Sequence, residues 1–157
     1  MRAPIKPRLL MPLALFAVAI PACGNDDETT TSPASAGPST VAVTLQEFAI
    51  GTVPATAAAG SVTFNATNNG PDDDHEFVVI QTDLSPTELP TKPDGSVDEE
   101  GAGITVIDEI EPFAPDKTET LTVDLQAGSY ALICNVYDAK EKEAHYQEGM
   151  RTGFTVT

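Results

Sequence analysis

The chain has 157 residues, of which 24 are acidic and 8 are basic, and its formal net charge is −16 at pH 7. This length is sufficient for one domain with a hydrophobic core. A strongly acidic surface repels nucleic acid and anionic lipid headgroups, so we expect neither to be bound. Such a surface would attract a basic protein, although solubility or adaptation to high salt explains the same composition.

The amino-terminal segment has the pattern of a secretory signal. Basic residues occur within the first eight positions, and an apolar run follows at 9–20. The run is too short for a membrane span of about 20 residues. Ala22-Cys23 and several polar residues come next, which resembles the cleavage and lipidation site of bacterial lipoproteins. We therefore predict a lipoprotein signal peptide at 1–22 and a lipid on Cys23. The alternative is an ordinary signal peptide with an incidental cysteine.

This prediction changes both the charge and the cysteine count. Removing the three basic residues of the signal leaves five basic and 24 acidic residues, a net charge of −19. If Cys23 carries lipid, Cys134 has no disulfide partner within the chain. An unpaired thiol outside the cytoplasm is open to oxidation unless it is buried or bound to a metal. A buried, inert cysteine is the simplest alternative.

The residues that follow the signal divide into a spacer and a domain. Residues 24–40 contain no bulky apolar side chain and cannot bury enough surface to offset chain entropy. We predict a lipid-anchored disordered linker at 23–40 and a folded domain at 41–157, held on the extracytoplasmic face of the cell membrane.

From Val41 onward the pattern indicates short strands separated by turns. Apolar residues alternate over 41–45, and the apolar pattern continues out of phase to Ile50, which indicates a bulge. Residues 84–102 are rich in proline, glycine and acid and predict an irregular excursion, while 140–147 predict one or two helical turns. The other expected strands are 62–66, 75–80, 104–110, 121–125, 130–135 and 151–156.

These seven to eight short strands predict an all-β fold. The expected architecture is a two-sheet antiparallel sandwich with Greek-key connections. The sequence contains no internal repeat, no glycine-rich phosphate loop and no nucleophile elbow. An enzyme is therefore the class of protein that we expect least.

Four residues of the predicted domain form a set of candidate metal ligands. His75 and His145 are the two histidines of the chain, and Cys134 and Met150 are the single cysteine and methionine after residue 40. Two imidazoles, a thiolate and a weak thioether are the ligand set of a blue-copper electron-transfer site. The alternatives are a surface His75 paired with Asp72–Asp74, a loop His145 and a core Met150.

The spacing of these residues resembles that of cupredoxins, the blue copper protein family. The resemblance is carried by His75 at the start of His-Glu-Phe-Val-Val-Ile, by Gly128-x-Tyr130-x-x-x-Cys134 and by His145-x-x-x-x-Met150. It implies a Greek-key β-sandwich over nearly all of 41–157 that binds one type 1 copper ion. His75, Cys134 and His145 would be the strong ligands and Met150 the weak axial ligand.

Two features depart from the family pattern. Ten residues separate Cys134 from His145, where the family has a handful, and we expect this charged insert to project into solvent. Glu76 stands where family members carry asparagine or serine. We predict that Glu76 and Asn135, which each follow a candidate ligand, support the site through hydrogen bonds.

The resemblance implies a monomeric, membrane-tethered carrier of single electrons between redox partners, one of which is expected to be basic. Two alternatives stay open. The first is a copper-handling or metal-delivery protein without redox turnover, and the second is a metal-free sandwich that acts as an interaction module. A multicopper oxidase is not expected, because the copper cluster of such enzymes needs further histidine pairs and the chain has two histidines.

Overall fold

The computed structural model describes residues 37–157. The predicted signal peptide, Cys23 and most of the predicted linker lie outside the described residues. The first strand begins at Ser39, two residues before the predicted start of the domain. The elements are β1 Ser39–Gln46, β2 Ala49–Val53, β3 Thr56–Ala57, β4 Gly60–Asn68, β5 His75–Thr82, β6 Ile104–Phe113, β7 Thr118–Leu125, β8 Gly128–Ile133, β9 Tyr137–Asp138, β10 Glu143–Ala144, α1 His145–Glu148 and β11 Arg151–Val156.

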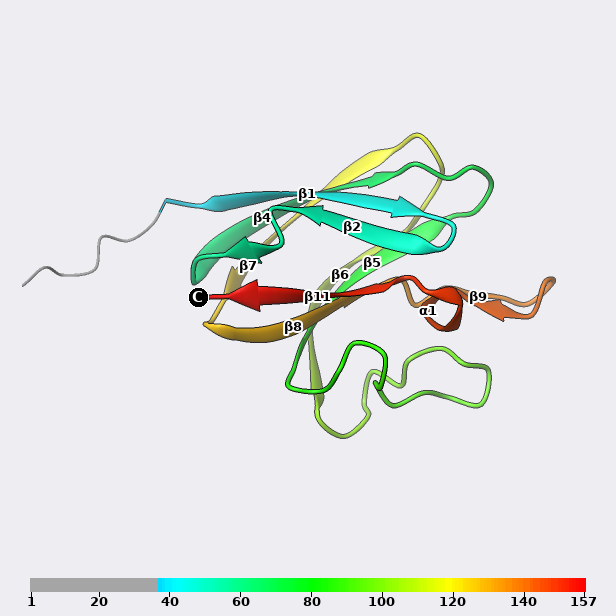
Figure 1. Ribbon diagram of the computed structural model, residues 1–157. Coiled ribbons are helices and arrows are strands. Elements are labelled where there is room, and N and C mark those ends of the chain that lie inside the picture. Colours follow the sequence, from blue (N-terminus) through cyan, green and yellow to red (C-terminus); the bar gives the residue numbers. More distant parts are fainter. Residues whose placement is uncertain (1–36) are drawn as a thin grey trace, which may run out of the picture. The chain divides into compact units, whose positions relative to one another are not determined.

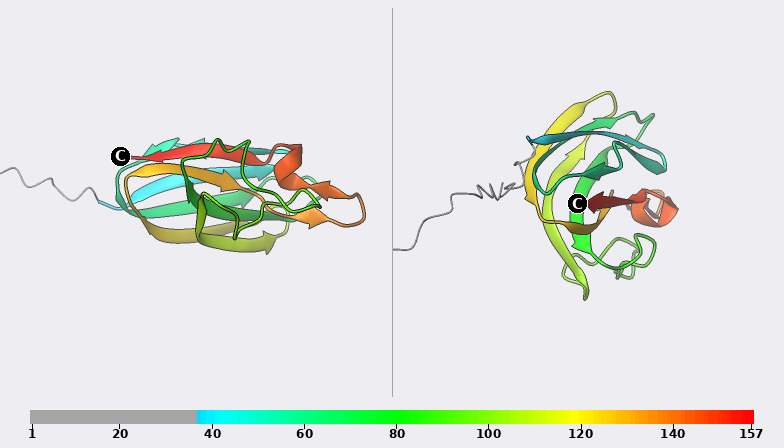
Figure 2. Two further views of the ribbon diagram at one scale, coloured as in Figure 1. Left: turned by 90° about the horizontal axis from the view of Figure 1, so that it is seen from below. Right: turned by 60° about the vertical axis from the view of Figure 1, so that its left-hand side comes forward.

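The strands form a two-layered β-sandwich (Figures 1 and 2). One sheet has the strand order β2-β1-β4-β7 and the other β3-β11-β8-β5-β6, and β9 and β10 form a separate small hairpin. The predicted all-β class and sandwich are confirmed. Eight strands have five or more residues, in agreement with the expected number, and three two-residue strands bring the total to eleven.

The sheets are mixed, so the expectation of purely antiparallel sheets was wrong. β1 pairs with β4 in parallel, and β11 pairs with the short β3 in parallel. The reason lies in the connection from β1 to β4. The chain forms the β1–β2 hairpin, crosses to the other sheet at β3 and returns, so it enters β4 in the same direction as β1.

The expected bulge between 41–45 and Ile50 was also wrong. The chain reverses at Glu47-Phe48, and β2 pairs antiparallel with β1 with Leu45 opposite Ile50. The change of hydrophobic phase therefore marks a tight hairpin. The other expected strands are confirmed with small changes of their ends, and 84–102 is irregular apart from one isolated bridge between Thr91 and Val97.

Two groups of buried side chains stabilise the domain. In the interior between the sheets, the Phe64 ring makes a tilted contact with Phe77 and an edge-to-face contact with Phe154, with ring centroids 5.3 and 5.5 Å apart, respectively. A second group lies on the outer face of β5 and β8, beneath the 84–102 excursion, and includes Val78, Ile80, Leu89, Val97, Ala131, Ile133 and Tyr146.

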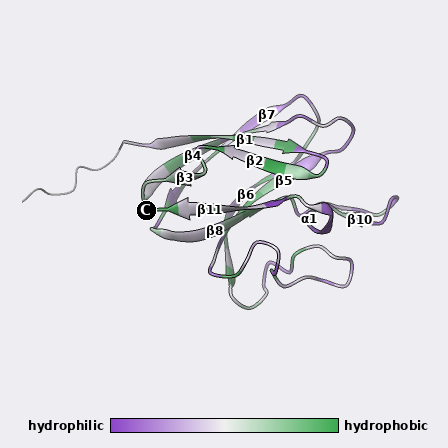
Figure 3. Ribbon diagram, in the orientation of Figure 1, coloured by the Kyte–Doolittle hydropathy of each residue, from purple (hydrophilic) through white to green (hydrophobic). Residues whose placement is uncertain are grey.

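The second group explains why β5 has no polar–apolar alternation. Its two faces are both covered, one by the facing sheet and the other by the excursion. Hydrophobic stretches accordingly run along the sandwich strands, whereas α1 and the β9–β10 hairpin are hydrophilic (Figure 3). All members of both groups lie between Val41 and Val156, so the segment 37–157 contains its own hydrophobic core.

Within the described residues, no helix has both the length and the hydrophobicity needed to cross a membrane.

Candidate metal centre

The antiparallel pairing of β5 with β8 brings the first two candidate ligands to one edge of the sheet. His75 is the first residue of β5, and Cys134 follows the last residue of β8. In the antiparallel register Val78 pairs with Ile133, so the start of β5 lies beside the end of β8. Two residues that are 59 positions apart in the sequence therefore become neighbours.

The third candidate ligand returns to the same place from the long insert. β9 and β10 form a small hairpin that projects beyond the sandwich (Figure 1). The N–H of His145 donates to the carbonyl of Val136 at 3.0 Å, which closes the insert at its base. The expectation that the insert projects into solvent and returns His145 is confirmed.

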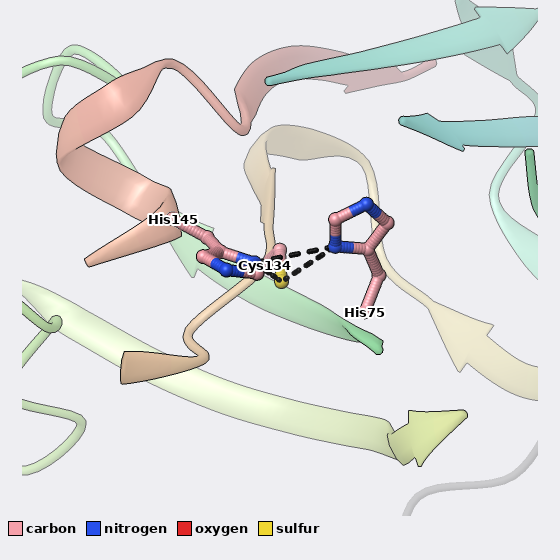
Figure 4. A group of neighbouring side chains, drawn as sticks. All are labelled: His75, Cys134 and His145. Atoms are coloured by element: carbon pink, nitrogen blue, oxygen red, sulfur yellow. Dashed lines mark hydrogen bonds between the residues drawn. The ribbon is translucent and has the colours of Figure 1, made fainter. Parts of the chain in front are cut away.

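The three strong candidate donors converge on one point (Figure 4). Nδ1 of His75 and Nδ1 of His145 are 3.2 Å apart, and the sulfur of Cys134 lies 3.9 and 3.5 Å from them, respectively. All three side chains are buried, with at most 1% of each residue exposed. Cys134 forms no disulfide in the described part of the chain.

Backbone hydrogen bonds hold Met150 next to this cluster. Its carbonyl accepts the N–H of Cys134 at 3.0 Å, and its own N–H donates to the carbonyl of His145 at 2.9 Å. Its side chain is fully buried and belongs to the same apolar group as Cys134. The structure thus brings Met150 to the two donors, and its role as an axial ligand stays a prediction.

Gly149 allows the ligand loop to pack against the β1–β2 turn. Its φ is +134°, and a Cβ at this position would lie 2.8 Å from the carbonyl oxygen of Phe48. The Phe48 ring also contacts the His145 ring edge-on, with centroids 5.3 Å apart. Glycine is therefore required here both by its backbone conformation and by the close approach.

The expected supporting residues, Glu76 and Asn135, are hydrogen-bonded to each other. The carboxylate of Glu76 accepts the N–H of Asn135 at 3.2 Å. The N–H of Glu76 itself points at the sulfur of Cys134, 3.3 Å away. Glu76 therefore connects the beginning of β5 to the loop after β8 through two contacts, one to the sulfur of Cys134 and one to the backbone of Asn135.

The side chain of Asn135 has a further role that the sequence did not indicate. Its amide exchanges hydrogen bonds with the backbone of Val97, at 2.6 and 3.2 Å, and donates to Glu99 at 2.7 Å. It thus attaches the 84–102 excursion to the ligand loop.

Tyr146 makes a second attachment of the same kind. Its hydroxyl donates to the carbonyl of Pro86 and accepts the N–H of Leu89. The guanidinium group of Arg151 lies over the ring of Tyr146, 5.0 Å from its centroid. Sequence reasoning passed over Tyr146 and also Glu47, whose carboxylate lies 3.7 Å from the ring of His75. No local pattern marks either residue, because their partners are distant in sequence.

Burial decides the protonation of the three donors. Desolvation is the largest cause that lowers the pKa of both His75 and His145 below 6.5, although nearby carboxylates oppose it. Desolvation also raises the pKa of the Cys134 thiol to about 12, against the opposing effect of backbone N–H groups at Val136 and Glu76. Without a metal, the site therefore contains a neutral thiol and neutral imidazoles at pH 7. A metal that binds the thiolate must displace a proton, so its affinity should rise with pH.

The entrance to the site is acidic. A surface pocket of about 450 Å³ reaches His145 and is lined on one side by Asp72, Asp73 and Asp74 and on the other by the hairpin. The Nε2 atom of His145 is 4.0 Å from a carboxylate oxygen of Asp73. These three aspartates therefore lie at the ligand end of the domain.

The cluster has the dimensions of a metal site. Bonds of about 2.0–2.1 Å to histidine and about 2.3 Å to cysteine separate three trigonal donors by roughly 3.5–3.8 Å. The observed separations of 3.2, 3.5 and 3.9 Å scatter around these values. Two imidazoles and a thiolate, with a thioether in the same buried group, fit one type 1 copper ion.

Comparison with solved structures gives the same fold. Auracyanin from Roseiflexus castenholzii superposes with a TM-score of 0.54 at 20% identity, covering 76% of this chain and 97% of that one. The "blue" copper protein auracyanin A from Chloroflexus aurantiacus gives 0.54 at 20% identity, covering 77% and 100%. Rusticyanin from Thiobacillus ferrooxidans gives 0.53 at 16% identity, covering 78% and 79%. No protein-family model and no curated protein sequence matches the chain.

The described domain thus has the cupredoxin fold, the β-sandwich of these solved structures. Its histidines and cysteine meet at the end of the sandwich to which β5 and β8 deliver them.

Glu76 predicts a pH dependence of stability in the metal-free domain. Burial, together with repulsion from Glu109 and Glu99, raises the pKa of Glu76 from 4.5 to about 7. The folded state therefore holds this proton more tightly than the unfolded state, and the group costs stability as the pH rises from about 4.5 through 7. Because Glu76 is partly exposed, we expect Glu76→Gln to stabilise the domain by only about 1–2 kcal/mol at pH 8 and by almost nothing at pH 5.

Urea denaturation of residues 37–157 with a chelator present would measure this difference. Glu119→Gln, which removes the same charge from an exposed position on β7, is the matched control. If the two substitutions changed the free energy of unfolding equally at pH 8, the stability cost assigned to the ionised Glu76 would be contradicted.

Proposed function

We propose that this protein is a type 1 copper protein that carries single electrons between redox partners outside the cytoplasm. The observation that supports the proposal is the buried cluster of Nδ1 of His75, Nδ1 of His145 and the sulfur of Cys134, with separations of 3.2–3.9 Å. Copper bound there would supply one-electron chemistry, because a thiolate with two imidazoles suits both of its oxidation states.

The surroundings of the cluster favour electron transfer because they restrict movement of the ligands. His75 and Cys134 lie at the ends of two paired core strands. His145 is held by backbone hydrogen bonds to Val136, Gly149 and Met150. Donors that are fixed by their supports change position little between oxidation states, and this keeps the reorganisation cost small.

The charge around the pocket supports a basic redox partner. Asp72, Asp73, Asp74 and Asp138 line the approach to His145 together with a single basic residue, Lys140. Acidic side chains at this position would accelerate the encounter with a cationic protein surface, at low ionic strength above all.

Tethering to a membrane is a proposal that rests on the sequence. The basic residues, the short apolar run and Ala22-Cys23 support lipidation of Cys23 and attachment to the extracytoplasmic face of the cell membrane. The spacer up to the first strand would then let the domain reach partners near the membrane surface.

The copper proposal predicts a colour. Adding Cu(II) to metal-free residues 37–157 should give an intense blue charge-transfer absorption, because the sulfur of Cys134 becomes a thiolate ligand. Cys134→Ser should abolish nearly all of the absorption, and Met150→Leu, which leaves the three strong donors intact, should keep it. Copper binding without a blue band, or with slow electron self-exchange, would favour metal storage or delivery instead.

The tether predicts a change of cell fraction. With the full chain expressed in a bacterium, Cys23→Ser should move most of the protein from the membrane fraction to the soluble extracytoplasmic fraction, because no lipid can be attached. Immunoblotting of the fractions measures this change, with Cys134→Ser as the matched cysteine control. Equal membrane retention of Cys23→Ser and the wild type would contradict lipid anchoring.

A further inference from the structure

The second ring nitrogen of His75 is in an unusual situation. Nδ1 faces the donor cluster, whereas Nε2 is buried and has no hydrogen-bond partner among residues 37–157. A buried polar atom without a partner loses the hydrogen bond that water would give it, so its environment requires an explanation. A carboxylate oxygen of Glu47, Oε1, lies 3.7 Å from this nitrogen.

Glu47 also has an unused atom. It lies in the turn between β1 and β2, and its side chain is 14% exposed. Oε1 accepts the N–H groups of Asp72 and Asp73 at 3.1 and 2.8 Å, which fixes the carboxylate in place. Its other oxygen, Oε2, is buried and has no partner within the described segment. The carboxylate that lies 3.7 Å from the unused ring nitrogen through Oε1 therefore also has an unused acceptor, Oε2.

We propose that Glu47 is a positioning residue for His75 and that its carboxylate accepts a hydrogen bond from Nε2–H of the ring. This inference deepens the proposed function and rests on it. Because Oε1, 3.7 Å from Nε2, already accepts two N–H groups, the free acceptor is Oε2, and a small rotation of the side chain would bring Oε2 within hydrogen-bond distance of Nε2. With its hydrogen on Nε2, the ring presents the lone pair of Nδ1 to the cluster. A carboxylate behind a metal-binding histidine fixes the tautomer and orientation of the ring and makes it a stronger ligand.

The metal-free cluster has the matching arrangement of protons. The two Nδ1 atoms of His75 and His145 are 3.2 Å apart, and two unprotonated nitrogens at this distance would repel each other. If Glu47 holds the hydrogen of His75 on Nε2, the shared proton belongs to His145, whose Nδ1–H donates to His75. Metal binding would then release one proton, from the Cys134 thiol, while the hydrogen of His145 would move from Nδ1 to Nε2 of the same neutral ring.

The simpler alternative is that Glu47 only ties the backbone of Asp72 and Asp73 to the β1–β2 turn. Glu47→Gln separates the two roles. The amide oxygen still accepts both backbone N–H groups, but an NH₂ group replaces the second oxygen and cannot accept from Nε2–H. A purely structural role should survive the substitution, whereas control of the tautomer should not.

The direct test is the tautomer of His75 in metal-free residues 37–157, from long-range ¹H–¹⁵N NMR correlations of the imidazole rings at pH 7.5. The wild type should show a protonated Nε2 and an unprotonated Nδ1, and Glu47→Gln should shift the ring toward the Nδ1–H form. Glu119→Gln is the control for the lost charge. A wild-type His75 with its hydrogen on Nδ1 would overturn the proposal, and this result needs no folded variant.

Copper affinity gives the second readout. By competition with a chelator, Glu47→Gln should bind Cu(I) and Cu(II) about 10- to 100-fold more weakly than the wild type, with Glu119→Gln unchanged. If a folded Glu47→Gln domain kept the wild-type tautomer and copper affinity, the role of Glu47 would be limited to its hydrogen bonds with the backbone of Asp72 and Asp73. If copper binds without the blue colour, the proposed function fails, but the NMR result on the metal-free domain still decides the role of Glu47.

Discussion

The antiparallel pairing of β5 with β8 is the constraint on which the site depends. It brings His75, at the start of one strand, beside Cys134, at the end of the other. Both strands are buried on two faces, by the facing sheet and by the 84–102 excursion, so their ends have little freedom. The loop from Cys134 to β11 then needs only to return His145 and Met150 to a position that is already set.

Burial gives this arrangement its chemical character. Charged forms of a thiol and of imidazoles are costly in a water-free interior, and the site holds all three groups neutral without a metal. Negative charge near the donors is instead carried by carboxylates that lie beside the two histidine rings, such as Asp73 and Glu47. A cation that replaces the thiol proton thus enters a pre-formed set of donors in an environment that favours positive charge.

Residue types alone narrowed the candidate metal ligands to a few side chains. Two histidines, one cysteine and one methionine in a domain of this size left few candidates, and the structure brings the three strong donors together. The strands were predictable because alternation over 41–45 and 121–125 reports one buried face. The β1–β2 hairpin and the parallel β1–β4 pairing were not, because the phase change near Phe48 has the same appearance for a bulge and a tight turn.

The supporting contacts were the least predictable part. Glu76 was identifiable because it follows a candidate ligand directly. Glu47, by contrast, reaches His75 across 28 positions of sequence, and Tyr146 reaches Pro86 across 60. Such contacts depend on how the sheets and the excursion pack, which local pattern does not encode.

The central claim is that the protein holds the three donors together before any metal arrives. Crystal structures of residues 37–157 in the metal-free and copper-loaded states test it most directly. The account predicts that Nδ1 of His75, Nδ1 of His145 and the sulfur of Cys134 lie within about 4 Å of one another in both states, with shifts of roughly 0.5 Å or less. A metal-free structure with His145 turned out into solvent, or copper bound among Glu76, Glu109 and Glu111 instead, would contradict it.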